Sequence, residues 1–256
     1  MLDRSADECS SVCTDITERL CGLRNRLTAA AERADRDPRE IRLVGVSKGQ
    51  PLDRILAALA NGVEWLGENY VQEALARRAV IEMRGNFPRL HWLGIGRLQS
   101  NKAKDAVAVF DGVESVDRRS LADALHKRAH SVGCVLEILI QVNICGEAQK
   151  GGVTEGELPD LLAHCASLSC LRVRGLMTIP AASADPEASR PVFARLRWLR
   201  DRHRRSPGGD GLTELSMGMS KDFEVAIEEG ATRIRLGTAL FGDRLQVHRS
   251  EDSGEP

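Results

Sequence analysis

The chain has 256 residues, 42% hydrophobic and 29% charged, which is the composition of a globular protein with a large core. Its 36 lysine and arginine residues nearly balance 37 aspartate and glutamate residues, which argues against a bulk electrostatic grip on nucleic acid. The first residues lack the apolar core of a signal peptide, and no stretch reaches the length of a membrane span. We therefore expect a cytoplasmic protein that binds neither nucleic acid nor membranes.

The seven cysteines are an odd number and contain no CxxC pair. This pattern argues against a disulfide framework and against a structural zinc site. We expect free thiols in a reducing compartment and no bound metal.

Eight short apolar runs have the length and composition of buried strands. They lie at Arg42–Val46, Glu64–Gly67, Leu90–Ile95, Val109–Val113, Val135–Val142, Val173–Met177, Glu214–Met217 and Arg233–Leu236. The segments between them have helical periodicity; Leu52, Ile55, Leu56 and Leu59, for example, follow the i, i+3, i+4, i+7 spacing of an amphipathic helix. A further helix is predicted near residues 7–33, ahead of the first strand.

Alternating strands and helices predict a parallel sheet with helical crossovers, and eight such units fit a closed barrel. The predicted fold is α/β, a single (β/α)8 TIM barrel over residues 1–247 with an extra N-terminal helix. Residues 248–256 are predicted to be a flexible C-terminal tail. A doubly wound open sheet is the competing fold, but no GxGxxG sequence follows the first strand.

The densest basic stretch, Arg195–Arg205, is predicted to be the solvated face of a helix that packs through Leu196, Trp198 and Leu199. An interaction surface on this helix is the alternative interpretation. A charge reversal there that left ligand binding unchanged would separate the two.

Lys48 directly follows the apolar run of the first predicted strand. In a barrel the carboxyl ends of the strands form the functional face, so the Lys48 amine is expected at the barrel mouth. Partial burial disfavours the charged form of an amine and makes it a better nucleophile, able to form a Schiff base with an aldehyde. An isolated lysine after a strand is more often an exposed residue, so this prediction depends on its neighbours.

Small and hydroxyl residues follow the seventh and eighth strands, where barrels commonly bind phosphate. They are Ser216 and Ser220 in one unit and Gly237 and Thr238 in the next. Glycines let backbone N–H groups approach phosphate oxygens, and hydroxyl groups add donors. Arg235 lies inside the eighth strand, where an inward guanidinium needs an acceptor, either a ligand or a structural ion pair.

Seven motifs, in order along the chain, resemble those of the pyridoxal-phosphate homeostasis proteins, which have the alanine racemase barrel without its second domain. The motifs are Val44-Gly-Val-Ser-Lys48, Gly67-Glu-Asn-Tyr-Val-Gln-Glu73, Gly96-Arg-Leu-Gln-Ser-Asn-Lys102, Gln141-Val-Asn-Ile144, Arg174-Gly-Leu-Met177, Leu215-Ser-Met-Gly-Met-Ser220 and Ile234-Arg-Leu-Gly-Thr238. The resemblance runs from about residue 10 to residue 244.

The resemblance implies that the chain binds pyridoxal 5′-phosphate (PLP), with Lys48 carrying the covalent aldimine. It implies phosphate contacts at Ser216, Gly237 and Thr238, with Ser220 nearby. It also implies that Arg235 faces the pyridine nitrogen and that Asn69 lines the pocket. One motif departs from the pattern, because Leu93 follows Trp92 where family members have histidine, and His91 precedes it.

A holder or carrier of PLP, with apo-enzymes as recipients and a monomeric or weakly dimeric state, is the function that the resemblance favours. A guanidinium keeps its proton, so the ring nitrogen beside Arg235 stays unprotonated and the ring is a weak electron sink. The chain has one tyrosine, Tyr70, and no second domain to supply a racemase base. A low-activity amino-acid racemase is the alternative, and a PLP-free barrel acting on a phosphorylated sugar is the third. Lys150, on the same rim, is a hypothetical second and transient PLP site.

Overall fold

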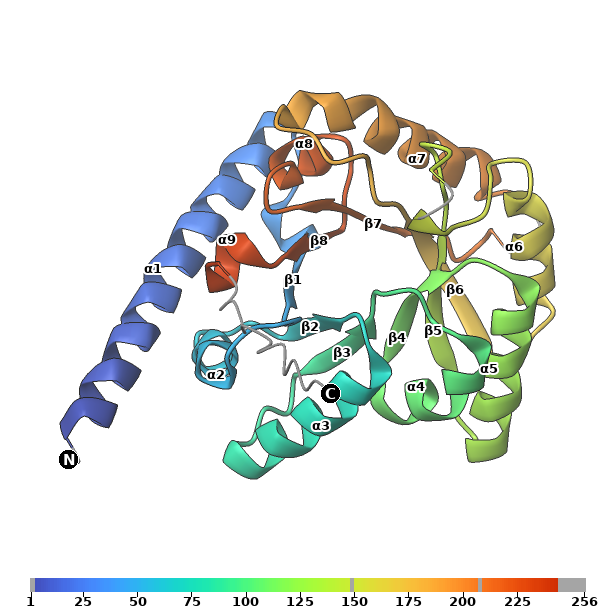
Figure 1. Cartoon of the computed structure of the whole chain (residues 1–256). Helices are drawn as coiled ribbons and strands as arrows, with labels where there is room; N and C mark the ends of the chain where they lie inside the picture. The colour runs from blue at the N-terminus through green and yellow to red at the C-terminus, as the bar shows by residue number, and fades with distance from the viewer. Residues whose placement is uncertain (1–2, 148–149, 207–208, 244–256) are drawn as a thin grey trace, which may run out of the picture.

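In the computed structural model, which describes residues 3–147, 150–206 and 209–243, eight parallel strands close into a barrel. The strands are β1 (Arg42–Val46), β2 (Trp65–Glu68), β3 (His91–Gly94), β4 (Gly112–Val116), β5 (Leu136–Gln141), β6 (Leu171–Met177), β7 (Glu214–Met219) and β8 (Arg233–Leu236). They follow one another around the barrel in chain order, and β1 pairs with β8 to close it (Figure 1). The TIM barrel is thereby confirmed, and the open sheet is excluded.

Helices surround the barrel on its outer side (Figure 1). They are α1 (Asp3–Arg33), α2 (Leu52–Ala60), α3 (Val71–Arg84), α4 (Ala103–Val109), α5 (Arg119–Val132), α6 (Leu158–Ala166), α7 (Arg190–His203), α8 (Phe223–Glu228) and α9 (Thr238–Phe241). Within the described residues, no helix combines the length and the apolar composition needed to cross a membrane. The predicted tail, residues 248–256, lies outside the described part, and the single-domain boundary at residue 247 stays a prediction.

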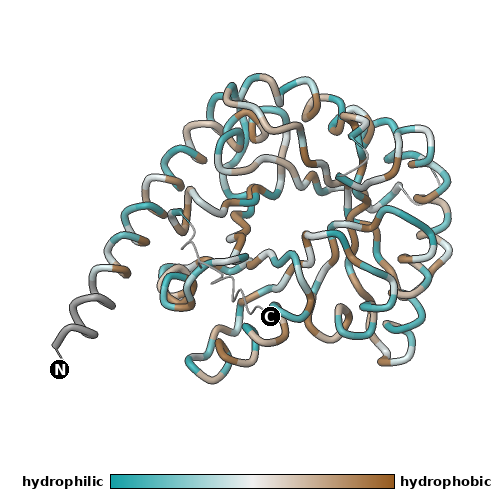
Figure 2. Tube along the Cα trace, in the orientation of Figure 1, coloured by the Kyte–Doolittle hydropathy of each residue, from teal (hydrophilic) through white to brown (hydrophobic). Residues whose placement is uncertain are grey.

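The extra N-terminal helix is confirmed as α1, which packs beside the seam between the first and last strands. Its residues Ile16, Leu20, Leu23 and Leu27 are buried at helical spacing. Figure 2 shows hydrophilic and hydrophobic residues alternating along this helix, as expected when one face meets the barrel and the other meets solvent.

The basic run lies mainly on α7, where Leu196 and Leu199 are buried as predicted. The prediction was wrong for Trp198, which is 41% exposed and lies under the guanidinium groups of Arg195 and Arg202. An indole flanked by two arginine side chains is partly shielded without entering the core.

The barrel interior contains an apolar cluster and a polar network. Val44, Leu93 and Ile95 form a small apolar cluster separate from the main core, which lies between the strands and the helices. The buried polar network, in which Arg42 alone is partly exposed, consists of Arg42, Glu114, Glu214, Ser216, Arg233 and Arg235.

Candidate functional site

A cavity of about 580 Å³ opens at the carboxyl ends of the strands. It brings together most of the residues predicted from the sequence, namely Asn69, Ser220, Arg235, Gly237 and Thr238. They come from the ends of β2, β7 and β8 and from the loops that follow. Parallel strands in a barrel all end at the same rim, which is why residues far apart in the chain meet here.

Arg235 forms part of the cavity wall from within β8 and is 4% exposed. Its Nη1 donates to the Ser216 hydroxyl at 2.6 Å, and its Nη2 donates to the Thr178 carbonyl at 2.8 Å. Burial lowers the pKa of Arg235 from its ordinary value, while the nearby charges of Glu114 and Asp222 act to raise it. A guanidinium titrates so far above neutrality that the group remains a cation.

Ser216 is fully buried, and its partners are within the protein. It donates to the Glu114 carboxylate at 2.5 Å and accepts from Arg235. Ser216 does not line the cavity, so its predicted phosphate contact stays a prediction. Glu114 itself was missed by the sequence reasoning, although a carboxylate inside a buried strand is a signal that a partner must exist.

The loop after β7 is shaped by Gly218, whose φ of +90° favours glycine. A Cβ at this position would lie 2.5 Å from the Cβ of Ala226. The register between β7 and β8 shifts here, so that Met219 pairs with Arg235. Ser220 then reaches the next unit, where its hydroxyl oxygen accepts from the backbone N–H of Ala239 at 3.2 Å.

Asn69 and Gly96 form the opposite wall of the cavity. A Cβ on Gly96 would lie 2.4 Å from the carbonyl oxygen of Asn69, so only glycine lets the two loops approach this closely. The close approach fixes the backbone of Asn69 at the cavity edge.

Lys48 follows β1 at the mouth as predicted, but its amine does not line the cavity. The Nζ atom lies 3.5 Å from the Tyr70 hydroxyl and 4.9 Å from the centre of its ring. The side chain lines a neighbouring shallow hollow together with Glu73 and Arg77. The structure therefore places the lysine beside the cavity, with its amine held by the only tyrosine of the chain.

A buried carboxylate lies close to the start of this loop. Glu68 is fully buried, accepts from the Ser47 hydroxyl at 2.5 Å and pairs with Arg77 at 2.8 Å. Burial raises the pKa of Glu68, with Ser47 and Arg77 opposing the rise. The pair fixes the backbone just before Lys48.

Three further lysines follow strands at this rim and are distributed unequally. Lys150 and Lys221 line the cavity, whereas Lys102 lines a separate hollow. The Lys150 amine is occupied by Glu147 at 2.8 Å and by the Pro180 carbonyl at 2.9 Å.

Leu93, at the position where the resembling proteins have histidine, is buried in the apolar interior cluster. His91 stacks on Trp65 with ring centroids 4.2 Å apart, near the amino ends of the strands. Neither residue lines the cavity.

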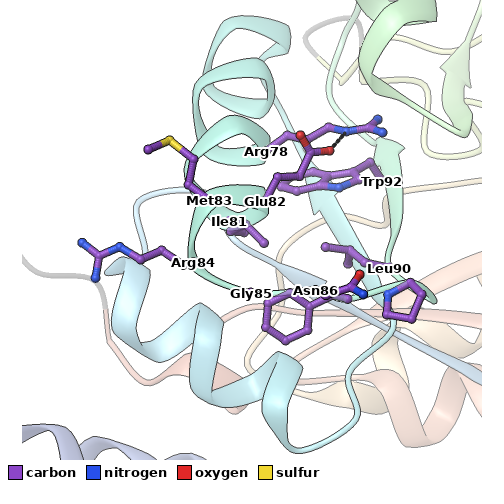
Figure 3. A pocket seen from close by; sticks show the side chains of 11 residues that line it. Arg78, Ile81, Glu82, Met83, Arg84, Gly85, Asn86, Leu90 and Trp92 are labelled. Atoms are coloured by element: carbon purple, nitrogen blue, oxygen red, sulfur yellow. Dashed lines mark hydrogen bonds and ion pairs between the residues drawn. The ribbon is translucent and has the colours of Figure 1, made fainter.

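A further hollow, of about 630 Å³, lies between the end of α3 and the amino end of β3 (Figure 3). Arg78 and Glu82 form an ion pair near Trp92, while Met83 and Arg84 extend away from it. This hollow is at the opposite end of the strands from the cavity and contains no predicted site residue.

The chain matches the family "Alanine racemase, N-terminal domain" over residues 20–245. It is 44% identical to the "Pyridoxal phosphate homeostasis protein" of Aquifex aeolicus, over 89% of this chain and 97% of that protein. The structure of PipY from Synechococcus elongatus with PLP bound is 36% identical with a TM-score of 0.78, covering 89% of this chain and all of PipY. An alanine racemase from Clostridium difficile, 15% identical with a TM-score of 0.67 over 89% of this chain and 56% of its own, shows a shared fold.

Proposed function

Because this chain belongs to the family of pyridoxal phosphate homeostasis proteins, we propose that it binds PLP in the cavity at the carboxyl ends of the strands. The observation that carries the proposal is the meeting of Asn69, Ser220, Arg235, Gly237 and Thr238 on one cavity next to Lys48. The structure of PipY with PLP bound, a relative of similar length, supports it.

The residues around the cavity suit a phosphorylated pyridine aldehyde. Ser220, Gly237 and Thr238 offer hydroxyl and backbone N–H donors for the phosphate. Arg235 offers N–H groups to the ring nitrogen. PLP, when bound, supplies an aldehyde that reacts with a primary amine, and Lys48 carries the amine next to the cavity.

In this proposal Lys48 must leave Tyr70 to reach the ligand. The contact between them consists of one long hydrogen bond and one cation–π contact, and Tyr70 is 52% exposed. Such contacts at exposed sites contribute only about 1 kcal/mol, so the lysine can turn inward at small cost.

We further propose that the protein holds or delivers PLP to apo-enzymes and has no robust turnover of its own. A permanently cationic Arg235 leaves the ring a weak electron sink, and Tyr70, the only tyrosine, contacts Lys48 itself. A cytoplasmic location and a monomeric or weakly dimeric state belong to the same proposal. The free thiols of the described cysteines support a reducing compartment.

The test is an absorbance spectrum of the purified protein with PLP, recorded for the wild type and for Lys48→Ala before and after borohydride. We expect the wild type to show a visible band that borohydride abolishes while the pyridoxyl group stays covalently attached to the protein, and we expect neither the band nor the attachment in Lys48→Ala. Lys221→Ala, which removes another lysine at the cavity, is the matched control and should keep the covalent label. A wild type without any band would overturn PLP binding, and measurable racemisation of free amino acids would favour the racemase.

A further inference from the structure

The buried polar network ends at the cavity in a chain of three groups from three strands. Glu114 on β4 accepts the hydroxyl proton of Ser216 on β7, with 2.5 Å between the oxygens. Ser216 accepts from Nη1 of Arg235 on β8 at 2.6 Å. Glu114 and Ser216 are almost completely buried, and Arg235 is the member that reaches the cavity.

The number of protons that each group carries fixes the donor and acceptor roles in this series of hydrogen bonds. A serine hydroxyl has one proton, and a guanidinium can only donate. Since Arg235 donates to Ser216, the Ser216 proton must point elsewhere, and the Glu114 carboxylate is the acceptor at hand. The serine is thereby held as an acceptor toward Arg235.

Two acceptors within the protein hold the Arg235 guanidinium. Its bonds to Ser216 and to the Thr178 carbonyl use two of the five N–H groups of an arginine. Arg235 also lines the cavity, where a ligand acceptor can bond to an N–H group that these two bonds do not use. The direction of that N–H group depends on the two acceptors, because the plane of a guanidinium turns as a unit.

We propose that Glu114 is a positioning residue for the ligand, which aims Arg235 at the ring nitrogen of PLP through the Ser216 hydroxyl. The inference rests on the proposed function and adds a residue outside the cavity to it. Glu114 itself touches no cavity wall. Its effect is transmitted by an oriented hydroxyl group.

The other carboxylate oxygen of Glu114 makes the side chain hard to replace. It pairs with Nη1 of Arg233 at 2.9 Å, so both neighbours of this carboxylate are donors. A glutamine has one acceptor and one donor group and can satisfy only one of the two. Either Arg233 or Ser216 then faces an N–H group.

Glu214 provides a matched control in the same network. It pairs with Arg42 at 2.6 Å and with Arg233 at 3.2 Å and has no bond to Ser216. Glu214→Gln therefore makes the same change of charge without touching the bridge to Arg235.

The experiment measures the dissociation constants of PLP and of its 1-deaza analogue, in which a C–H group replaces the ring nitrogen. For Glu114→Gln we expect the dissociation constant of PLP to rise about tenfold, as for loss of a hydrogen bond to a charged group. The constant of the deaza analogue should change by less than about twofold, because it has no nitrogen for Arg235 to contact. Glu214→Gln should leave both constants within about twofold of the wild type.

Ser216→Ala is the second variant, in case Glu114→Gln does not fold. It deletes the bridge and leaves the pair of Glu114 with Arg233 in place. It should likewise raise the dissociation constant of PLP while changing that of the deaza analogue by less than about twofold. Equal weakening of PLP and the deaza analogue, or no weakening in either variant, would overturn the positioning role. A wild type that binds no PLP would instead overturn the proposed function.

Discussion

Two groups of residues in the barrel interior solve the same packing problem with different chemistry. Val44 on β1, Leu93 on β3 and Ile95 just after β3 fill space with apolar groups. Glu114, Glu214 and Arg233 fill it with charges that are at most 5% exposed. An apolar side chain needs only a site of suitable volume, whereas a buried charge needs a specific partner for each of its polar atoms.

The difference explains which group can recognise a polar ligand. Ile95 of the apolar cluster lines the cavity, but its side chain has no polar atom. The charged group pairs Arg233 with both glutamates, and Glu114 is linked through Ser216 to Arg235 at the cavity. Arg235 at the cavity is thus supported by a network of buried hydrogen bonds and ion pairs.

The largest expected effect comes from breaking the charged network. Arg233→Met removes the cation that pairs with both Glu114 and Glu214 and leaves Glu214 paired with Arg42. We expect the free energy of unfolding to fall by about 3–5 kcal/mol, as when one member of a buried ion pair is removed. Urea unfolding followed by circular dichroism measures this.

The matched control for this prediction is Arg89→Met, which makes the same substitution at an exposed pair with Glu64. Its free energy of unfolding should stay within about 0.5 kcal/mol of the wild type. If both variants lost the same free energy of unfolding, removing one member of a buried ion pair would cost no more than removing one member of an exposed pair.

A somewhat smaller loss of unfolding free energy is expected in the apolar cluster. Leu93→Ala leaves a void inside the barrel, where the leucine is 1% exposed. We expect a loss of about 3 kcal/mol, within the range of leucine-to-alanine substitutions in cores. Leu93→Met, which conserves volume, should cost less than about 1.5 kcal/mol in the same urea titration. A stable Leu93→Ala variant would show that the interior tolerates voids there.

The smallest expected effect is the pH dependence of the stability that two buried glutamates, Glu214 and Glu68, contribute. Burial alone would raise the pKa of Glu214, but Arg233 and Arg42 hold it below its usual 4.5. A lowered pKa gives stability that is present above the unfolded value and lost as the pH falls through the folded value. Glu214→Gln should therefore cost about 2 kcal/mol at neutral pH, and this cost should shrink as the pH falls below about 4.5.

Glu68 supplies the opposite sign. Its pKa is raised by burial, so its contribution is present below the unfolded value and lost as the pH rises through the folded one. The free energy of unfolding of the wild type, relative to that of Glu68→Gln, should therefore fall as the pH rises. Unfolding free energies at a series of pH values test both, and parallel curves for the two glutamates would contradict the assignment.

Much of the fold could be predicted from the sequence, because buried strands and amphipathic helices have distinct periods. The predicted bounds of β1 and β8 agree with the structure. The fourth strand was misplaced: Val109 ends α4, and β4 begins at Gly112. An apolar run that spans a helix end and a strand start has no periodicity that could locate the boundary.

The site was predictable to the extent that it depends on strand ends. Arg235, Gly237 and Thr238 lie at the cavity because β8 leads there. The orientation of the Lys48 amine toward Tyr70 and the bond from Ser216 to Glu114 depend on side-chain packing across strands far apart in the chain. The residues near each position in the sequence do not determine such contacts.

The seam beside α1 has a consequence for folding. Barrel closure requires β1 to meet β8, and the ion pair of Arg26 with Glu224 across the neighbouring helices joins positions 198 residues apart. Contacts between residues so far apart in the sequence form late and slowly, since a long loop must close first. The cavity includes Val46 from β1 and Arg235 from β8, so it is complete only after closure. A ligand that contacts both strands binds only the closed barrel. Raising the concentration of such a ligand therefore increases the free energy of unfolding of the closed barrel.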